Sequence, residues 1–162
     1  MSSQFILIFG IICALIALSG GVWWWFSSRQ ALFSDNDIVT MQFPHGKIVA
    51  EVSAGLLKQA AGLSGRTELA SSTGMLFVFS SPRKETFWMK GMKIPLDFIW
   101  LTKGVVIEIR SQVQPPKNIL DMTLVAPSRP ADSVLEVPAG TVQELKIQVG
   151  DKVEIKKNSN IK

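Results

Sequence analysis

The sequence has few of the residues that most often carry out reactions in proteins. Of its 162 residues, one is cysteine and one is histidine. Cys13 lies in an apolar N-terminal stretch, so an intrachain disulfide and a zinc site built from thiolates are both excluded. His45 stands between a proline and a glycine in an expected turn, with no serine nearby. The sequence therefore gives almost no support to Ser-His-acid or Cys-His catalysis.

Other binding patterns are also missing from the sequence. No glycine-rich phosphate loop precedes a helix, and no loop has the spacing of a calcium site. Basic residues outnumber acidic ones by 17 to 13, but they are scattered and not interleaved with aromatic residues as in a nucleic-acid groove. Met89 and Met92 are soft ligands for Cu(I), although methionine in a β core usually fills space. We expect no cofactor, no metal and no nucleic-acid partner.

Charge is absent from residues 5–26, which are long enough to cross a bilayer. Trp23, Trp24 and Trp25 near the end of this stretch suit the headgroup region of a membrane. We therefore expect an uncleaved transmembrane anchor. The alternative is a cleaved signal peptide, for which residues 19–21 offer small side chains.

The remainder of the chain consists of short apolar runs separated by glycine and proline. This pattern predicts an all-β fold, a small barrel or sandwich with two short helices, preceded by the transmembrane helix. We divide the chain into an anchor and tether (residues 1–33), a β domain (34–157) and a polar tail (158–162).

Individual elements of the β domain are predicted from local patterns. Residues 38–52 read as a hairpin, and the helical spacing that follows ends at Gly62, a residue type that favours the helix C-terminus. The apolar run from Gly74 to Pro82 predicts a strand buried on both faces. "LDFIWL" and "VVIEIR" form a second hairpin around "TKG".

Near the C-terminus, Thr141 and Glu144 have the spacing of a capping box. They predict a helix of one or two turns that starts there. The apolar residues of "KVEI", from Lys152 to Ile155, predict a closing strand.

Residues 85–100, "ETFWMKGMKIPLDFIW", hold two tryptophans, two methionines, two lysines and one aspartate in an apolar stretch that a proline interrupts. Strand alternation puts Phe87 and Met89 on one face and Trp88 and Lys90 on the other. Beyond Pro95, the same rule separates two sets of residues. Leu96, Phe98 and Trp100 share a face opposite Asp97, Ile99 and Leu101.

This alternation predicts a cleft in which Trp88 forms an apolar wall and Lys90, Asp97 and Glu136 supply polar groups. A sugar ring could stack on Trp88, with Lys90 and Asp97 bonding its hydroxyls or an acidic substituent. The alternative is that Trp88 covers an open face of the sheet while Lys90 extends over it.

Asp97 and Glu136 are acids within otherwise apolar strands. If their strands adjoin, two carboxyls with shifted pKa values could act as general acid and base on a glycan or ester-like bond. A structural role, such as an aspartate accepting backbone N–H groups, is the more common explanation for such residues.

Five strings resemble the domain of unknown function 192 family over about residues 43–156. They are GMLFVF (74–79), FWMK (87–90), IPLD (94–97), LEVPAG (135–140) and GDKV (150–153). The resemblance implies a compact β-rich fold in small bacterial and archaeal proteins, often exported or membrane-tethered, with no agreed activity. Ser64 departs from the pattern, where methionine is usual, and residues 111–132 match it least.

We therefore expect a membrane-anchored β domain that binds a ligand of the cell envelope, such as a glycan, and is not an enzyme. The family resemblance places this domain outside the membrane, although Arg29, which follows the apolar span, weakly favours a cytoplasmic domain. Expected partners are the membrane, through residues 5–26, and an envelope glycan or a membrane protein. The alternatives are an envelope hydrolase or transferase that uses Asp97 and Glu136, and a structural partner of a membrane complex.

Overall fold

The computed structural model describes residues 33–118, 121 and 123–158. The expected anchor at residues 5–26 and all but one residue of the polar tail lie outside this part of the chain. Within the described residues, no helix is long and apolar enough to cross a membrane.

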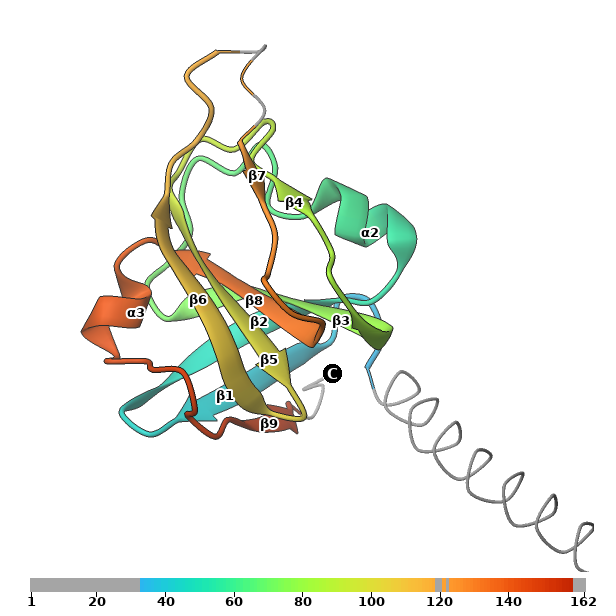
Figure 1. Ribbon diagram of the computed structural model, residues 1–162, viewed down its shortest axis with the longest axis vertical. Coiled ribbons are helices and arrows are strands. Elements are labelled where there is room, and N and C mark those ends of the chain that lie inside the picture. Colours follow the sequence, from blue (N-terminus) through green and yellow to red (C-terminus); the bar gives the residue numbers. More distant parts are fainter. Residues whose placement is uncertain (1–32, 119–120, 122, 159–162) are drawn as a thin grey trace, which may run out of the picture.

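Most of the described chain forms a seven-stranded sheet with the strand order β6-β5-β8-β3-β2-β1-β9 (Figure 1). Its strands are β1 (Ile38–Phe43), β2 (Gly46–Ser53), β3 (Thr73–Arg83), β5 (Leu96–Thr102), β6 (Val105–Val113), β8 (Ala131–Pro138) and β9 (Glu154–Lys157). A two-stranded sheet and two short helices complete the fold. They are β4 (Phe87–Trp88) paired with β7 (Leu124–Val125), and α2 (Leu56–Ala61) and α3 (Thr141–Glu144).

The all-β prediction with two short helices is confirmed, but the sheet is not closed into a barrel, which was one of the two predicted architectures. The edge strands β6 and β9 do not pair with each other, so the main sheet stays open. A single bridge between Val105 and Lys152 joins the start of β6 to the residues before β9. One bridge does not provide the continuous strand pairing that closes a barrel.

Both predicted hairpins are present. β1 and β2 are antiparallel, with Phe43 opposite Gly46 at the turn. β5 and β6 are joined through Lys103 and Gly104, which have φ values of 53° and 74°. Two successive residues with positive φ are typical of the tight turn that matches the twist of the strands.

The predicted helix after β2 is α2, and it ends at Ala61 as expected. Gly62 follows with a φ of 49° and donates its N–H to the carbonyl of Lys58. The helix lies in the crossover between β2 and β3, which pair in parallel. Because parallel neighbours cannot be joined by a tight turn, α2 and the loop after it provide the crossover connection that the pairing needs.

The predicted helix at Thr141 is α3, but its capping box is wrong. Gly140 is the N-cap residue, and its carbonyl accepts the N–H of Glu144 at 2.9 Å. Thr141 is already helical, and its hydroxyl donates to the carbonyl of Pro138 at 2.7 Å. The positive φ of Gly140, 97°, starts the helix one residue earlier than the sequence spacing predicts.

Strands β3, β5 and β8 are buried on both faces, as predicted for the run after Gly74. On the inner face, side chains from all seven strands form one apolar cluster, so the sheet curls around it. Phe77, Phe98 and Trp100 belong to a second cluster on the outer face. The alternation predicted along β5 is confirmed, because Ile99 and Leu101 lie in the first cluster.

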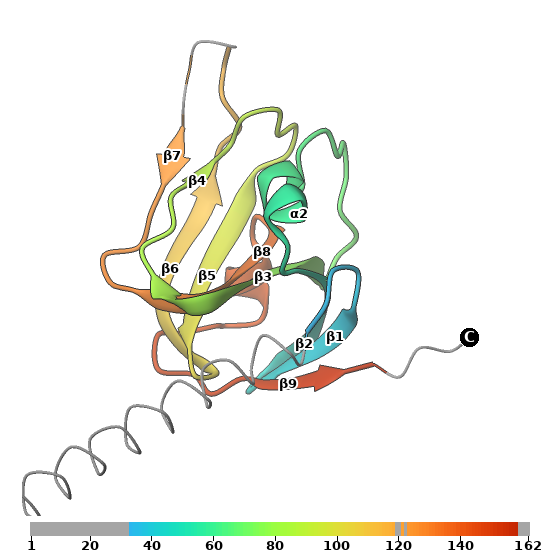
Figure 2. The ribbon, with the colours of Figure 1, turned by 90° about the vertical axis from the view of Figure 1, so that its right-hand side faces the viewer.

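The second cluster is covered by α2 and the β4–β7 pair, which lie on the same side of β3 and β8 (Figure 2). Phe87 and Val125 are opposite each other in this pair and are both buried. Leu63, just after α2, is buried in the same cluster. These short elements thus form a second layer over the outer face of the sheet.

Asp97 is fully buried on the inner face. Its carboxylate accepts the backbone N–H groups of Gln112 at 2.7 Å, Gly140 at 3.0 Å and Val142 at 2.9 Å. These bonds join β5 to an irregular position in β6, where Gln112 has a positive φ of 56°, and to the start of α3. The structure therefore gives Asp97 three backbone partners.

We predict that Asp97→Asn destabilises the domain by on the order of 3 kcal/mol. An amide has a single oxygen acceptor and would turn an N–H donor toward backbone donors, and hydrogen bonds to charged groups are worth about 1.5–3 kcal/mol each. Urea unfolding of residues 34–162 measures the change. Glu68→Gln, an acid-to-amide change at an exposed position, is the control and should shift the free energy of unfolding by less than about 0.5 kcal/mol. Equal stabilities of the two variants would contradict the prediction.

Candidate functional site

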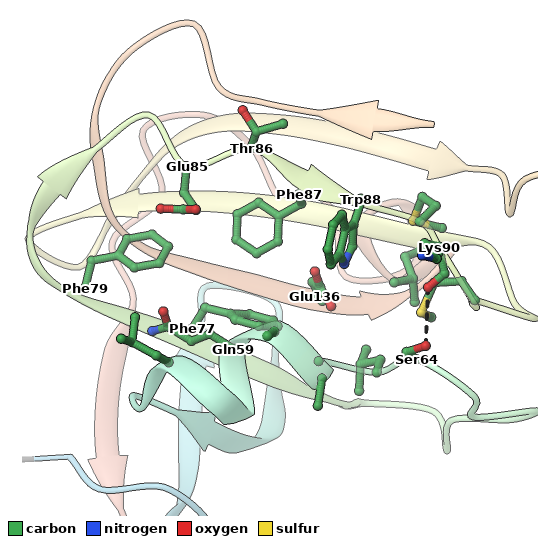
Figure 3. A pocket seen from close by; sticks show the side chains of 18 of the residues that line it. Gln59, Ser64, Phe77, Phe79, Glu85, Thr86, Phe87, Trp88, Lys90 and Glu136 are labelled. Carbon is green, nitrogen blue, oxygen red and sulfur yellow. Dashed lines mark hydrogen bonds between the residues drawn. The ribbon is translucent and has the colours of Figure 1, made fainter. Parts of the chain in front are cut away.

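A pocket of about 330 Å³ opens between α2 and the segment that leads into β4 (Figure 3). Phe77 of β3 and Glu136 of β8 form its floor. Phe87 and Trp88 line one side, and Gln59 with the residues after α2 lines the other. The pocket therefore lies between the two layers described above.

The alternation predicted for residues 87–90 is confirmed. Phe87 is 9% exposed and Met89 is fully buried, whereas Trp88 is 52% exposed and Lys90 is exposed. Although Trp88 points away from the core, it lines the pocket. A half-exposed indole at a pocket mouth is available to a ligand.

Aromatic rings surround Phe87 on the inner side of the pocket. Its ring centroid is 5.2 Å from that of Phe77 in an edge-to-face arrangement and 6.5 Å from that of Phe79. On the core side, it is 5.8 Å from the Phe98 centroid. Such contacts hold the rings in place and leave the pocket with an apolar, aromatic lining.

Charged side chains lie at the rim. The Arg83 Nε atom is 2.6 Å from the Glu85 carboxylate, and the Arg83 guanidinium lies 4.3 Å above the Phe79 ring. Lys90 places its ammonium 6.0 Å from the centroid of the Trp88 ring. Exposed pairs of this kind stabilise a fold by less than about 1 kcal/mol, so their main effect is on the charge of the pocket mouth.

The loop after α2 is tied to the chain after β4, and this contact closes one end of the pocket. Ser64 donates its hydroxyl to the carbonyl of Lys90 at 3.2 Å, and Gly65 donates its N–H to the carbonyl of Gly91 at 2.9 Å. Gly91 has a φ of 74°, which favours glycine, and a Cβ atom there would also force the Ser64 hydroxyl to move. Ser64, where the sequence departs from the family pattern, thus has a structural contact of its own.

Glu136 points into the pocket from β8 and is 5% exposed (Figure 3). Its strand lies close to β3, since a Cβ atom at Gly74 would stand 2.4 Å from the Glu136 carbonyl oxygen. Within the described part of the chain, no residue donates a hydrogen bond to its carboxyl or forms an ion pair with it. Burial therefore raises the pKa of Glu136 from 4.5 to about 8.

Asp97 does not take part in this pocket. In the β5–β8 register, Asp97 is opposite Val137 and Phe98 is opposite Glu136. Neighbours on paired strands share a face, so the Asp97 and Glu136 carboxyls lie on opposite faces of the sheet. The structure therefore brings together Trp88, Lys90 and Glu136 of the four predicted residues and leaves Asp97 on the other side.

Sequence reasoning missed several residues of the pocket. Phe77 and Phe79 are two residues apart in β3 and therefore lie on the same face. This aromatic pair was a sequence signal that could have identified a second wall of the pocket. Gln59 donates its side-chain amide to the carbonyl of Val78 at 3.0 Å, and no sequence pattern indicated that contact.

At neutral pH, the pocket has a protonated carboxyl at its floor, able to donate or accept a hydrogen bond, and aromatic side chains at its walls. This arrangement suits a small polar ligand with an apolar face. Within the described residues, no three histidine, cysteine or acidic side chains are grouped as metal ligands. Met89 and Met92 are both buried in the aromatic cluster.

Comparison with known proteins gives a family and a fold. The DUF192 family model, described as Uncharacterized ACR, matches residues 39–155. A protein of unknown function from Novosphingobium aromaticivorans DSM 12444 is 36% identical and similar in structure, with a TM-score of 0.63 over 72% of this chain and 83% of that one. A candidate transcription regulator from Sinorhizobium meliloti 1021 is 26% identical, with a TM-score of 0.65 over 75% of this chain and 96% of that one. No curated protein matches the chain.

We predict that the stability of the domain falls between pH 5 and pH 8 because of Glu136. In this range the folded protein keeps a proton on Glu136 that the unfolded chain has lost, since the pKa is about 8 when folded and 4.5 ordinarily. The free energy of unfolding then decreases by up to about 1.4 kcal/mol per pH unit. Glu136→Gln lacks this ionisation, so the stability of the variant relative to the natural protein should increase with pH.

Urea unfolding of both proteins at pH 5, 6.5 and 8 measures this difference. The two proteins share all other titratable groups, including His45, so the comparison isolates Glu136. If the free energies of unfolding of the two proteins change in parallel across this range, burial does not raise the pKa of the Glu136 carboxyl.

Proposed function

We propose that this chain, which belongs to the DUF192 family, is a membrane-anchored module that binds a small polar ligand of the cell envelope in the pocket between α2 and β4. The main support is Glu136, a buried carboxyl without a described partner in a pocket that opens to solvent. A buried polar group without a partner costs free energy. Such a cost is commonly retained where a ligand supplies the partner.

A glycan is the ligand class that the pocket walls suit best. The exposed face of Trp88 can stack on the apolar face of a sugar ring, and the Glu136 carboxyl can bond a ring substituent. Lys90, at the rim, can bond a hydroxyl or an acidic group. The pocket volume of about 330 Å³ lies at the lower end of the range for small-molecule sites.

The hydrolase or transferase alternative has less support. It needs two carboxyls on one substrate, and Asp97 and Glu136 lie on opposite faces of the sheet. The carboxylate of Asp97 is also bound by three backbone N–H groups. Binding is therefore the better supported role.

The start of the described chain is attached to the pocket helix. Asp35 accepts the N–H groups of Ala54 and Gly55 at 2.7 and 2.9 Å, just before α2. Nine residues, 27–35, connect this point to the apolar stretch and can span at most about 30 Å. If residues 5–26 cross the bilayer, α2 lies close to the membrane surface.

Leu56 and Leu57 at the start of α2 are 80% and 90% exposed. They are adjacent to the pocket, and an exposed apolar pair at such a place often marks a contact surface. They favour, as a second candidate, the role of structural partner in a membrane complex. The ligand-binding role has the stronger support, because it also accounts for the buried carboxyl of Glu136.

We predict that Trp88→Ala weakens binding of soluble envelope-glycan fragments by about fivefold, because aromatic stacking contributes about 1 kcal/mol. The fold should remain intact, since half of this side chain is already exposed. Isothermal titration calorimetry measures the affinity. Leu124→Ala is the control, because Leu124 is the cross-strand neighbour of Trp88, has similar exposure and does not line the pocket.

Equal loss of affinity in both variants would indicate a general disturbance of the β4–β7 pair. If neither variant changes the affinity, Trp88 does not take part in ligand binding.

We also predict that the full chain stays in the membrane fraction after a carbonate wash, whereas a chain that begins at residue 34 is soluble. The expected reason is the uncharged stretch at residues 5–26. Cell fractionation followed by mass spectrometry of the N-terminus tests this. A mature protein that begins after Gly21 and is released from the membrane would instead support a cleaved signal peptide.

A further inference from the structure

We propose that the pocket selects ligands that carry a protonated amine, with the ammonium group paired to Glu136 between Phe77, Phe87 and Trp88. This inference rests on the proposed function of the pocket as a ligand site, and it names the chemical group that the site recognises.

The charges around the pocket leave its floor without a cation. Arg83 is held at the rim in an ion pair with Glu85 and over the Phe79 ring. Lys90 extends over Trp88 at the rim and forms no ion pair with Glu136. A cation that enters the pocket therefore meets an acid that no described side chain neutralises.

The walls strengthen this preference. Phe77, Phe87 and Trp88 come from two different strands and lie around the Glu136 carboxyl in Figure 3. Aromatic faces attract cations, and a hydrogen bond between charged groups is about twice as strong as one between neutral groups. An ammonium group gains both interactions, whereas a hydroxyl in the same place gains one neutral hydrogen bond.

The rim limits the rest of the ligand. The Arg83–Glu85 ion pair carries no net charge, so Lys90 gives the mouth a net positive charge that disfavours a second cation and favours hydroxyl or acidic groups there. The pocket therefore suits a ligand with one ammonium group at its inner end and hydroxyls or an acidic substituent at its outer end. An amino sugar with a free amine has this arrangement, and its N-acetylated form does not.

Pairing with an ammonium group requires Glu136 to be ionised. Its pKa of about 8 means that the ligand must displace a proton at lower pH. The other titratable groups that line the pocket are Arg83, Glu85 and Lys90, and α2 and β5 contribute none. Affinity for an alkyl amine, which stays protonated to about pH 10, should therefore rise by up to tenfold per unit between pH 6 and pH 8.

The test compares ligands of one shape that differ in charge. The full chain, purified in a polyoxyethylene detergent, is titrated calorimetrically with cyclohexylamine and with cyclohexanol at pH 6, 7 and 8. At pH 8 we expect cyclohexylamine to bind at least tenfold more tightly than cyclohexanol. This difference in affinity should decrease toward pH 6. Glucosamine should likewise bind more tightly than N-acetylglucosamine at pH 7.

Two variants assign the effect to Glu136. Glu136→Gln should abolish the preference for the amine and its pH dependence, while circular dichroism shows an unchanged fold. Glu144→Gln makes the same change at an exposed position of α3, outside the pocket lining, and should keep both effects.

Three results would overturn the inference. Cyclohexanol could bind as well as cyclohexylamine, Glu136→Gln could keep the preference, or no amine could bind at millimolar concentration. The first two would leave the pocket a ligand site of another chemistry. The Trp88→Ala comparison with glycan fragments tests the proposed function separately, because it does not depend on an amine.

Discussion

Burial of both faces of β3, β5 and β8 is the constraint on which the rest of the structure depends, because each face needs its own cover. On the inner face, the sheet covers itself by curling around one apolar cluster. On the outer face, the cover comes from α2 and the short β4–β7 pair. Two such small elements cannot pack as closely as a second full sheet would, and the pocket is the space that remains between them.

The two buried acids, Asp97 and Glu136, have very different surroundings on the two faces of the sheet. Asp97 faces the side where β6 and the start of α3 offer three backbone N–H groups, which donate to both of its carboxyl oxygens. Glu136 faces the aromatic side, where no described group donates to it, so burial favours its neutral form. The first residue connects three elements of the fold, and the second lies at the pocket floor without a described hydrogen-bond donor.

Much of the local structure followed from sequence patterns. Alternation separated Phe87 from Trp88 and Leu96 from Asp97, because strand side chains must point to opposite faces. Turn and helix-end residues such as Gly62 marked element boundaries for the same local reason. The capping box at Thr141 was misplaced because Gly140 could adopt a positive φ and begin the helix earlier. Of the four residues that the sequence placed in a cleft, Trp88, Lys90 and Glu136 line the pocket, whereas the aromatic wall at Phe77 was not predicted.

The sequence alone determined which residues are apolar, which face of each strand they occupy and where the chain turns, since these properties depend on neighbours a few residues away. Tertiary structure decided the parallel pairing of β2 with β3, the open sheet and the separation of Asp97 from Glu136. These features depend on strand register and on which elements cover each face. Strand register and the covering of each face are determined by contacts between residues that are distant in the chain. No local sequence pattern specifies such contacts.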